Sequence, residues 1–316
     1  MEPGQESTAA DWKKRREHII GLTGSRQFFF LCKNTAADRA WLVSGERGEL
    51  VKNIFIEGLQ GMGKSTLLQA ISQKAPEYHV CREGDYSPFE LAWCTWMTEK
   101  EYRESLQKFQ NLRKEISMHT FREGEHYIVT YTKILTDAAG FHQYFGEYEI
   151  YNGRKPFREL EEIILSRYRK YTGTGCLTEC AFMQNIMEEL ILFQQLDDDE
   201  ILSFYERLYD AAACRDSFLL LYLYSGNIAE NLEIIRRERS DAQGNQLWHD
   251  LMMSYLASSP YGRKHGYTGP EHLVQHLRHR QQLELRVINE ILKGRAAVLP
   301  AKQWEPGEVF RLIKTK

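Results

Sequence analysis

Residues 58–66 read Gly-Leu-Gln-Gly-Met-Gly-Lys-Ser-Thr and decide the fold of this chain. They contain the full pattern G-x-x-x-x-G-K-[ST], which is typical of loops that bind the phosphates of a nucleotide. The segment 51–57 before the loop is mostly apolar and predicts a buried strand. The segment 65–74 after it predicts a helix with one apolar face, ended by Pro76. A strand, a glycine loop and a helix in this order are the structural context that the pattern requires.

The chemistry of such a loop makes particular residue types necessary. Glycines allow the backbone to turn tightly, so that its N–H groups and the positive end of the following helix face the phosphates. The Lys64 ammonium would reach the β- and γ-phosphates, and the Ser65 hydroxyl would bind Mg²⁺. We therefore expect ATP and Mg²⁺ as cofactors, with the nucleotide held by Gly58, Gly61, Met62, Gly63, Lys64, Ser65 and Thr66.

Composition and charge exclude several classes of protein. The 316 residues are 42% hydrophobic and 27% charged, which is ordinary for a folded globular chain. The net charge of −3 gives no electrostatic reason to expect nucleic acid or a membrane surface as a partner. The longest apolar run, 218–224, is far shorter than the roughly 20 residues that cross a bilayer. No apolar signal-like segment begins the chain and no Cys-x-x-Cys pair occurs, so we expect a cytoplasmic location.

The rest of the sequence alternates between strand and helix patterns, which predicts an α/β class. We expect a three-layer P-loop NTPase fold, with a parallel sheet flanked by helices and an insertion between the second and third core strands. Strands are predicted at 78–82, 176–179, 218–224 and 295–300. Helices are predicted at 99–117, 157–171, 180–193, 198–213, 228–239, 243–257 and 270–293.

The domain organisation follows from this pattern. Residues 1–50 form an N-terminal extension with two candidate short strands, at 28–31 and 39–43. Residues 51–300 form the α/β domain, and 301–316 form a C-terminal tail. The insertion is placed at about 118–155, where a strand-like alternation at 126–135 is followed by glycines at intervals.

Acidic residues follow two of the predicted strands. Glu83 and Asp85 come after the strand at 78–82, and Glu179 ends the strand at 176–179. In an open parallel sheet, ligands bind at the carboxyl ends of the strands. Glu83 or Asp85 could take the proton of an attacking hydroxyl, and Glu179 could hold Mg²⁺. The alternatives are turn formation for the first two acids and helix capping for Glu179.

Arginines follow the strand at 218–224 by about one helix. The run Arg236-Arg237-Glu238-Arg239 could place guanidinium groups over a phosphoryl group in transfer. The alternative is a solvated helix surface. We take Arg237 and Arg239 as candidate catalytic residues beside Lys64, Glu83 and Asp85.

Residues 56–67 resemble the start of the deoxynucleoside kinase and thymidylate kinase group of P-loop kinases. The resemblance covers about 200 residues in order and is strong only at the loop. It implies that Glu83, in Arg-Glu-Gly-Asp, is the acid that positions the acceptor, and that Glu179 belongs to a later acid position. It also implies that Arg237-Glu238-Arg239 forms an arginine-bearing lid. Where the group has an arginine after the second acid, this chain has Cys180.

Two functions are compatible with these features. The first is an ATP-dependent phosphotransferase that resembles nucleoside or nucleoside-monophosphate kinases and passes the γ-phosphate to a small hydroxyl or phosphate acceptor. The second is a nucleotide-binding regulatory ATPase whose insertion binds a partner. Nucleosides and nucleotides are the candidate acceptors, and a homodimer is an open alternative.

Overall fold

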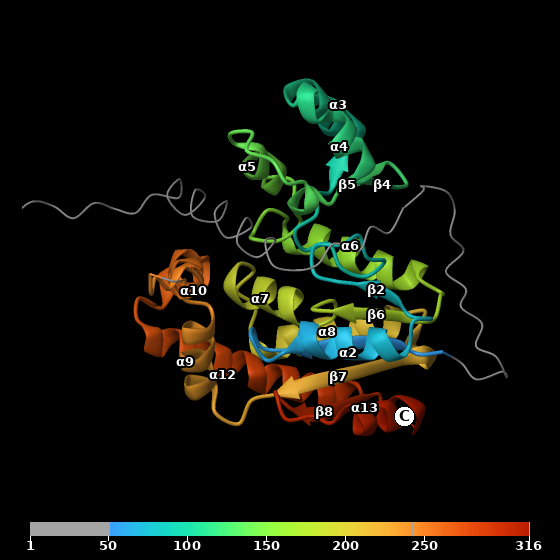
Figure 1. The fold of residues 1–316 in the computed structure, drawn as a ribbon, viewed down its shortest axis with the longest axis vertical. Helices are drawn as coiled ribbons and strands as arrows, with labels where there is room; N and C mark the ends of the chain where they lie inside the picture. The colour runs from blue at the N-terminus through green and yellow to red at the C-terminus, as the bar shows by residue number, and fades with distance from the viewer. Residues whose placement is uncertain (1–50, 242, 316) are drawn as a thin grey trace, which may run out of the picture.

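The computed structural model describes residues 51–315 except residue 242, and is shown as a ribbon in Figure 1. The predicted N-terminal extension, with its candidate strands at 28–31 and 39–43, lies outside the described residues. The described chain forms a central sheet with helices packed on it and a smaller lobe that carries its own sheet (Figure 1).

The central sheet confirms the predicted α/β class. Its five strands all pair in parallel, in the order β2-β6-β1-β7-β8. They are β1 (Asn53–Gly58), β2 (His79–Cys81), β6 (Cys176–Glu179), β7 (Phe218–Tyr224) and β8 (Ala296–Pro300). β6 lies between β1 and β2, so two strands that follow each other in sequence are not neighbours in space. β1, which leads into the glycine loop, is the middle strand and is buried along its whole length.

Helices cover both faces of this sheet (Figure 1). They are α2 (Lys64–Lys74), α6 (Phe157–Lys170), α7 (Gln184–Leu192), α8 (Asp198–Ala211), α9 (Ile228–Glu238), α10 (Leu247–Ser258), α11 (Pro260–Lys264), α12 (Pro270–Arg286), a π-helical turn (Val287–Ile291) and α13 (Pro306–Thr315). Within the described residues, no helix is long and apolar enough to cross a membrane.

The C-terminal segment is more ordered than the predicted tail at 301–316. α13 packs on α2 and buries Val309 and Ile313. These two residues are four positions apart and so lie on one helix face. The apolar spacing that makes this segment a helix is present in the sequence but spans only ten residues.

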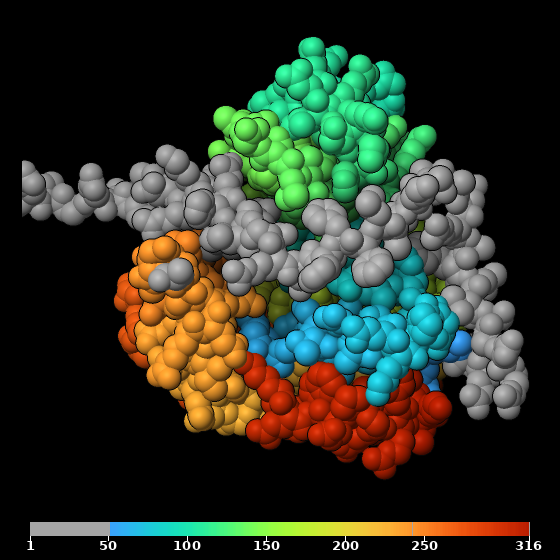
Figure 2. All heavy atoms as spheres, in the orientation of Figure 1, coloured from blue at the N-terminus to red at the C-terminus, as the bar shows by residue number. Residues whose placement is uncertain are grey.

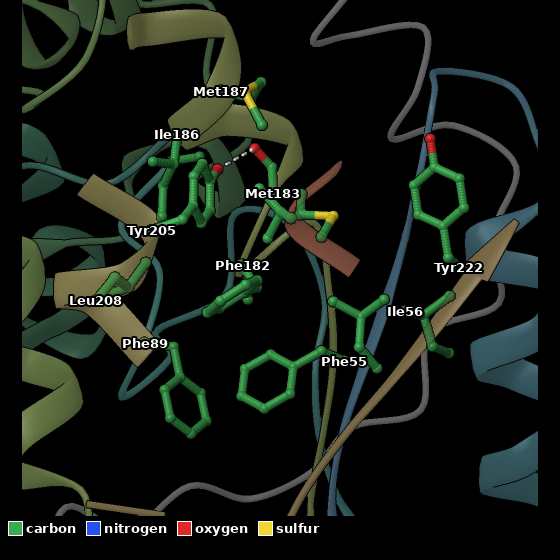
Figure 3. Packing of buried hydrophobic residues seen from close by; sticks show 14 of the residues in the cluster. Phe55, Ile56, Phe89, Phe182, Met183, Ile186, Met187, Tyr205, Leu208 and Tyr222 are labelled. Atoms are coloured by element: carbon green, nitrogen blue, oxygen red, sulfur yellow. Dashed lines mark hydrogen bonds between the residues drawn. The ribbon is translucent and has the colours of Figure 1, made fainter. Parts of the chain in front are cut away.

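One face of the sheet is filled by aromatic rings. Phe55 of β1 points toward Phe89 and Phe182 (Figure 3). Its ring centroid lies 4.4 Å from that of Phe218 and 4.8 Å from that of Phe89, and it also stacks on Tyr168 of α6. Adjacent residues of a strand point to opposite faces, so Ile56 packs on the other side of β1. This ring cluster joins β1, β7, α6 and the loop after β2.

A small lobe stands apart from the sheet and forms the top of the molecule in Figure 2. Its antiparallel strands pair in the order β3-β5-β4. Its elements are β3 (Met97–Thr98), α3 (Glu99–Lys108), a 3₁₀ turn (Gln110–Leu112), α4 (Arg113–Met118), β4 (Thr120–Glu123), β5 (His126–Val129), a second 3₁₀ turn (Tyr131–Lys133) and α5 (Phe141–Gly146). The lobe has its own core, formed by Met97, Ile116, Val129, Tyr131, Ile134, Phe141 and Phe145.

This lobe begins earlier than the segment 118–155 that the sequence suggests for an insertion. The helix predicted at 99–117 is broken near Phe109 into α3 and α4, and both contribute to the lobe. α3 starts with a capping box, in which Thr98 and Glu101 satisfy each other's backbone N–H groups. The strand predicted at 126–135 ends at Val129, where the chain turns into 3₁₀ structure.

The aromatic cluster predicts how much stability is lost when one of its rings is removed. Phe55→Ala should lower the free energy of unfolding by about 3 to 5 kcal/mol, because four ring contacts and the burial of Phe55 are lost together. The control is Val298→Ala in β8, whose side chain is 47% exposed and should lose less than about 1 kcal/mol. Denaturant unfolding of both variants is the measurement, and equal losses would contradict a core centred on Phe55.

Candidate functional site

The glycine loop leaves the carboxyl end of β1 in the conformation that its glycines permit. Gly61 and Gly63 have φ angles of 75° and 92°, in the left-handed region that favours glycine. A Cβ on Gly61 would lie 2.2 Å from the Ile235 side chain, and one on Gly58 would lie 2.5 Å from the Leu223 carbonyl oxygen. The loop is therefore packed closely against α9 and β7, and only glycine fits at these positions.

Lys64 is folded back into the loop that carries it. Its ammonium Nζ donates to the carbonyl oxygens of Gly58 and Leu59, at 2.9 and 2.8 Å. It also donates to Oε1 of Gln184, at 2.8 Å. Lys64 is the first residue of α2, so its charge and the positive end of the helix lie together. This region can neutralise a polyphosphate.

Ser65 and Glu179, the two predicted magnesium ligands, are in contact. The Ser65 hydroxyl donates to Oε2 of Glu179 at 2.7 Å. The pairing of β6 with β1 produces this contact, since Glu179 lies opposite Ile56, two residues before the loop. Burial raises the pKa of Glu179, while the bond from Ser65 and the charge of Lys64 oppose the rise. Glu179 does not cap α7, which begins five residues later.

Glu83 and Asp85 separate into different environments. Oε1 of Glu83 accepts from Trp93 Nε1 at 3.1 Å and from Gln184 Nε2 at 3.4 Å. Glu83 thus lies one side chain away from Lys64. Asp85 accepts from the Arg82 N–H at 2.8 Å and pairs with Lys133 of the small lobe at 2.8 Å. Asp85 closes a turn and joins the two lobes, which matches the alternative reading of this acid.

The arginines after β7 also differ from each other. Arg237 is 76% exposed and pairs with Glu233 of its own helix at 3.1 Å, so the structure does not bring it to the loop. Arg239 is also exposed, but its guanidinium carbon lies 4.9 Å from the ring centroid of Trp248. Burial lowers the pKa of Arg239, and the charges of Glu238 and Glu83 oppose this. Arg239 comes directly after α9, and its backbone N–H donates at 2.9 Å to the carbonyl of Ile235, the residue that packs on Gly61.

Two buried side chains of the site are not singled out by any motif. Glu57 accepts from the backbone N–H groups of Phe182 and Gln184, at 2.6 and 3.1 Å. Burial raises its pKa to about 7, while three N–H groups and Lys64 pull it down. Gln184 joins Lys64 to Glu83. A charged residue inside an apolar strand, 51–57, is the sequence signal that could have pointed to Glu57.

A buried charge network supports the loop from behind. Arg280 of α12 has no exposed surface and donates to Glu284 at 2.9 Å, to Gln60 of the loop at 3.0 Å, and to Glu188 of α7. His276 Nε2 lies 2.7 Å from the same Glu188. Burial pushes the pKa of Glu188 up, but His276 and Arg280 hold it well below its usual range. The network fixes the side chain of Gln60 and so restrains the first residues of the glycine loop.

Lys302, in the turn after β8, is a further charged group near the loop. A Cβ on Gly63 would lie 4.0 Å from Lys302 Cγ, and Lys302 Nζ pairs with Glu238 at 3.2 Å. No sequence motif marks Lys302, which lies in the segment 301–316 that is predicted to be a C-terminal tail.

Comparisons with known proteins do not assign this chain to a family. No protein-family model and no curated protein sequence matches the chain. Among solved structures, the chain is similar to a gluconokinase from Sinorhizobium meliloti 1021, with 12% identity and a TM-score of 0.29. That alignment covers 84% of this chain and 90% of the other. A similarity of this size establishes neither a shared fold nor a shared activity.

The buried network predicts a large loss when its cation is removed. Arg280→Met should lower the free energy of unfolding by about 3 to 5 kcal/mol, because Glu188 and Glu284 would stay buried with one positive partner fewer. Arg286→Met, on the same helix, removes an exposed pair with Glu290 and should leave the free energy of unfolding close to the parent value. Denaturant unfolding at constant pH compares the two, and a stable Arg280→Met variant would show that the network is not needed for folding.

Proposed function

We propose that the protein is an ATP-dependent phosphotransferase that passes the γ-phosphate to a small hydroxyl or phosphate acceptor. The observation that carries this proposal is the contact of Ser65 with Glu179. Ser65 follows Lys64, whose ammonium is bonded to the carbonyls of the glycine loop. A hydroxyl and a carboxylate together are the oxygen ligands that a P-loop protein uses for Mg²⁺. With a lysine beside them, they complete the donor side of a phosphoryl-transfer site.

The residues present fit a magnesium nucleotide. α2 begins at Lys64, and the Lys64 ammonium lies against the carbonyl oxygens of the loop. The N–H groups at the start of the helix and the charge of Lys64 could therefore both face the phosphates. Ser65 and Glu179 would hold Mg²⁺, which would neutralise charge between the β- and γ-phosphates. The hydrogen bond from the Ser65 hydroxyl to Glu179 would then be replaced by contacts of both side chains with the ion.

The acceptor side would be built around Glu83. Both hydrogen bonds that reach Glu83 in the described part of the chain, from Trp93 and Gln184, end on Oε1. Oε2 is thus the oxygen to which an acceptor hydroxyl could donate, and Glu83 would orient that hydroxyl or take its proton. We keep nucleosides and nucleotides as the first acceptors to test. Arg239, directly after α9, would supply positive charge to the group in transfer.

A regulatory ATPase is the second candidate function. The small lobe favours it, since this lobe has a separate core and exposes Met118 and Leu135, at 69% and 66%. Cys180 also stands where the kinases of the resembled group have an arginine. In this case the lobe would bind a partner and hydrolysis would need no small acceptor.

The first experiment tests the donor site. Lys64→Ala should weaken Mg-ATP binding by about tenfold or more, because no backbone group replaces the lost charge. Glu179→Gln should lose more turnover at limiting than at saturating Mg²⁺, because the amide keeps the shape but not the charge. Calorimetric ATP binding and a magnesium titration of turnover measure these effects. Parent-like ATP binding by Lys64→Ala would overturn the assignment of the loop.

A phosphoryl-transfer assay on the parent protein separates the two functions. The parent protein is incubated with labelled ATP and a panel of nucleosides, nucleotides and small polyols. Acceptor-dependent ADP release with a labelled product supports the phosphotransferase. Slow hydrolysis that no acceptor stimulates supports the regulatory ATPase.

We expect substitutions of Arg237 and Arg239 to have unequal effects on turnover. Arg239→Ala should lower turnover by about a hundredfold while ATP affinity changes only a few-fold, because charge that acts on the group in transfer stabilises the transition state. Arg239→Lys should recover only part of the loss, since lysine lacks the planar fork. Arg237→Ala should lose much less, because Arg237 is paired with Glu233 on its own helix. Equal turnover in the two alanine variants would contradict the role given to Arg239.

A further inference from the structure

The carboxamide of Gln184 is the side chain that joins the donor and acceptor sides of the site. Its Oε1 accepts from Lys64 Nζ at 2.8 Å, and its Nε2 donates to Oε1 of Glu83 at 3.4 Å. Gln184 is 5% exposed, so water competes little for either bond. No motif assigns this residue, and the bridge is visible only in the folded chain.

The backbone that carries Gln184 is held on two sides. Its own N–H donates to the buried carboxylate of Glu57 at 3.1 Å, which ties the first residue of α7 to the central strand. One turn later, Glu188 is bonded to Arg280 and Gln60. The start of α7 cannot easily shift, so changes in the bridge must come from rotation of the Gln184 side chain.

Lys64 has no free donor while this bridge exists. An ammonium group has three N–H donors, and the three acceptors are the Gly58 carbonyl, the Leu59 carbonyl and Gln184. To bond a phosphate oxygen, Lys64 must give up at least one of them. Two acceptors are backbone atoms of the loop itself, whereas Gln184 is a side chain from another element and can be released by rotation.

We propose that Gln184 is a positioning residue that couples occupancy of the phosphate loop to the placement of Glu83. This inference rests on the proposed function. Without nucleotide, Gln184 holds Lys64 inside the loop and donates to Glu83. When Lys64 turns to a phosphate, the carboxamide loses its donor and can reorient. The acceptor carboxylate thus changes its surroundings only when the donor site is filled.

Two substitutions with opposite expected signs test the coupling. Gln184→Leu removes the acceptor that competes for Lys64, so Mg-ATP should bind about threefold or more tightly than to the parent. Gln184→Glu gives Lys64 a charged partner and places a negative charge near the phosphates, so binding should weaken by about tenfold or more. Both variants should lose turnover with the best acceptor, because the amide donor to Glu83 is absent.

The control is Asn185→Leu, the next residue of α7, whose side-chain amide donates to the Cys180 carbonyl at 3.2 Å. It should bind ATP like the parent. Calorimetric binding is measured without acceptor, and thermal melting checks that each variant folds. If Gln184→Leu does not fold, Gln184→Met serves in its place, because it keeps length and removes the acceptor amide.

The outcomes separate this inference from the proposed function. If Lys64→Ala binds ATP like the parent, the loop assignment itself fails. If Lys64→Ala loses binding but the Leu or Met and Glu variants at 184 change affinity in the same direction, Gln184 is only structural and the coupling is wrong. Opposite changes in affinity, with loss of turnover in both, support it.

Discussion

The position of β1 in the middle of the sheet is the constraint on which the rest of the structure depends. β1 pairs with β6 on one side and β7 on the other, and helices cover both of its faces. The backbone groups of β1 are therefore satisfied within the sheet. The chain changes direction only where the strand ends, at Gly58. The glycine loop starts there, against the Leu223 carbonyl of β7, with Glu179 of β6 beside it.

Two buried carboxylates near the loop respond to burial in opposite ways, and their partners explain why. Glu57 receives hydrogen bonds from backbone N–H groups, which do not fully offset the loss of water, so its pKa rises to about 7. Glu188 faces Arg280 and His276, and its pKa falls well below the usual range. Glu57 thus connects β1 to the start of α7 through backbone N–H groups, whereas Glu188 belongs to a charged network that must stay complete.

The small lobe is joined to the body at the segment that also carries Glu83. Lys133 pairs with Asp85 at 2.8 Å, and the Tyr86 hydroxyl donates to Glu123 at 2.8 Å. Glu123 is also paired with Arg167 of α6, which is buried. Because Asp85 and Tyr86 follow Glu83 closely in the chain, movement of the lobe would shift the segment that carries Glu83. This arrangement suits both a kinase with a substrate lobe and an ATPase that responds to a partner.

The sequence by itself determined the local parts of the protein. The glycine loop, the strand before it and the helix after it depend on contacts within about twenty residues, and β6 and β7 were recognisable as short apolar runs. The prediction that Lys64, Ser65 and Glu179 belong to one site followed from the loop pattern and from the rule that sites form at strand ends.

The tertiary structure alone decided which distant groups meet. The sequence does not state that β6 pairs with β1, and this pairing is what brings Glu179 to Ser65 at 2.7 Å. Asp85 and Glu83 are two residues apart, yet only Glu83 reaches the bridge through Gln184, because Asp85 is held by Lys133. Glu57, Gln184 and Arg280 carry no motif, since their roles arise from contacts with residues of other elements that are 92 or more positions away. Such contacts depend on how the helices and strands pack, and this packing cannot be predicted from the spacing of residues along the chain.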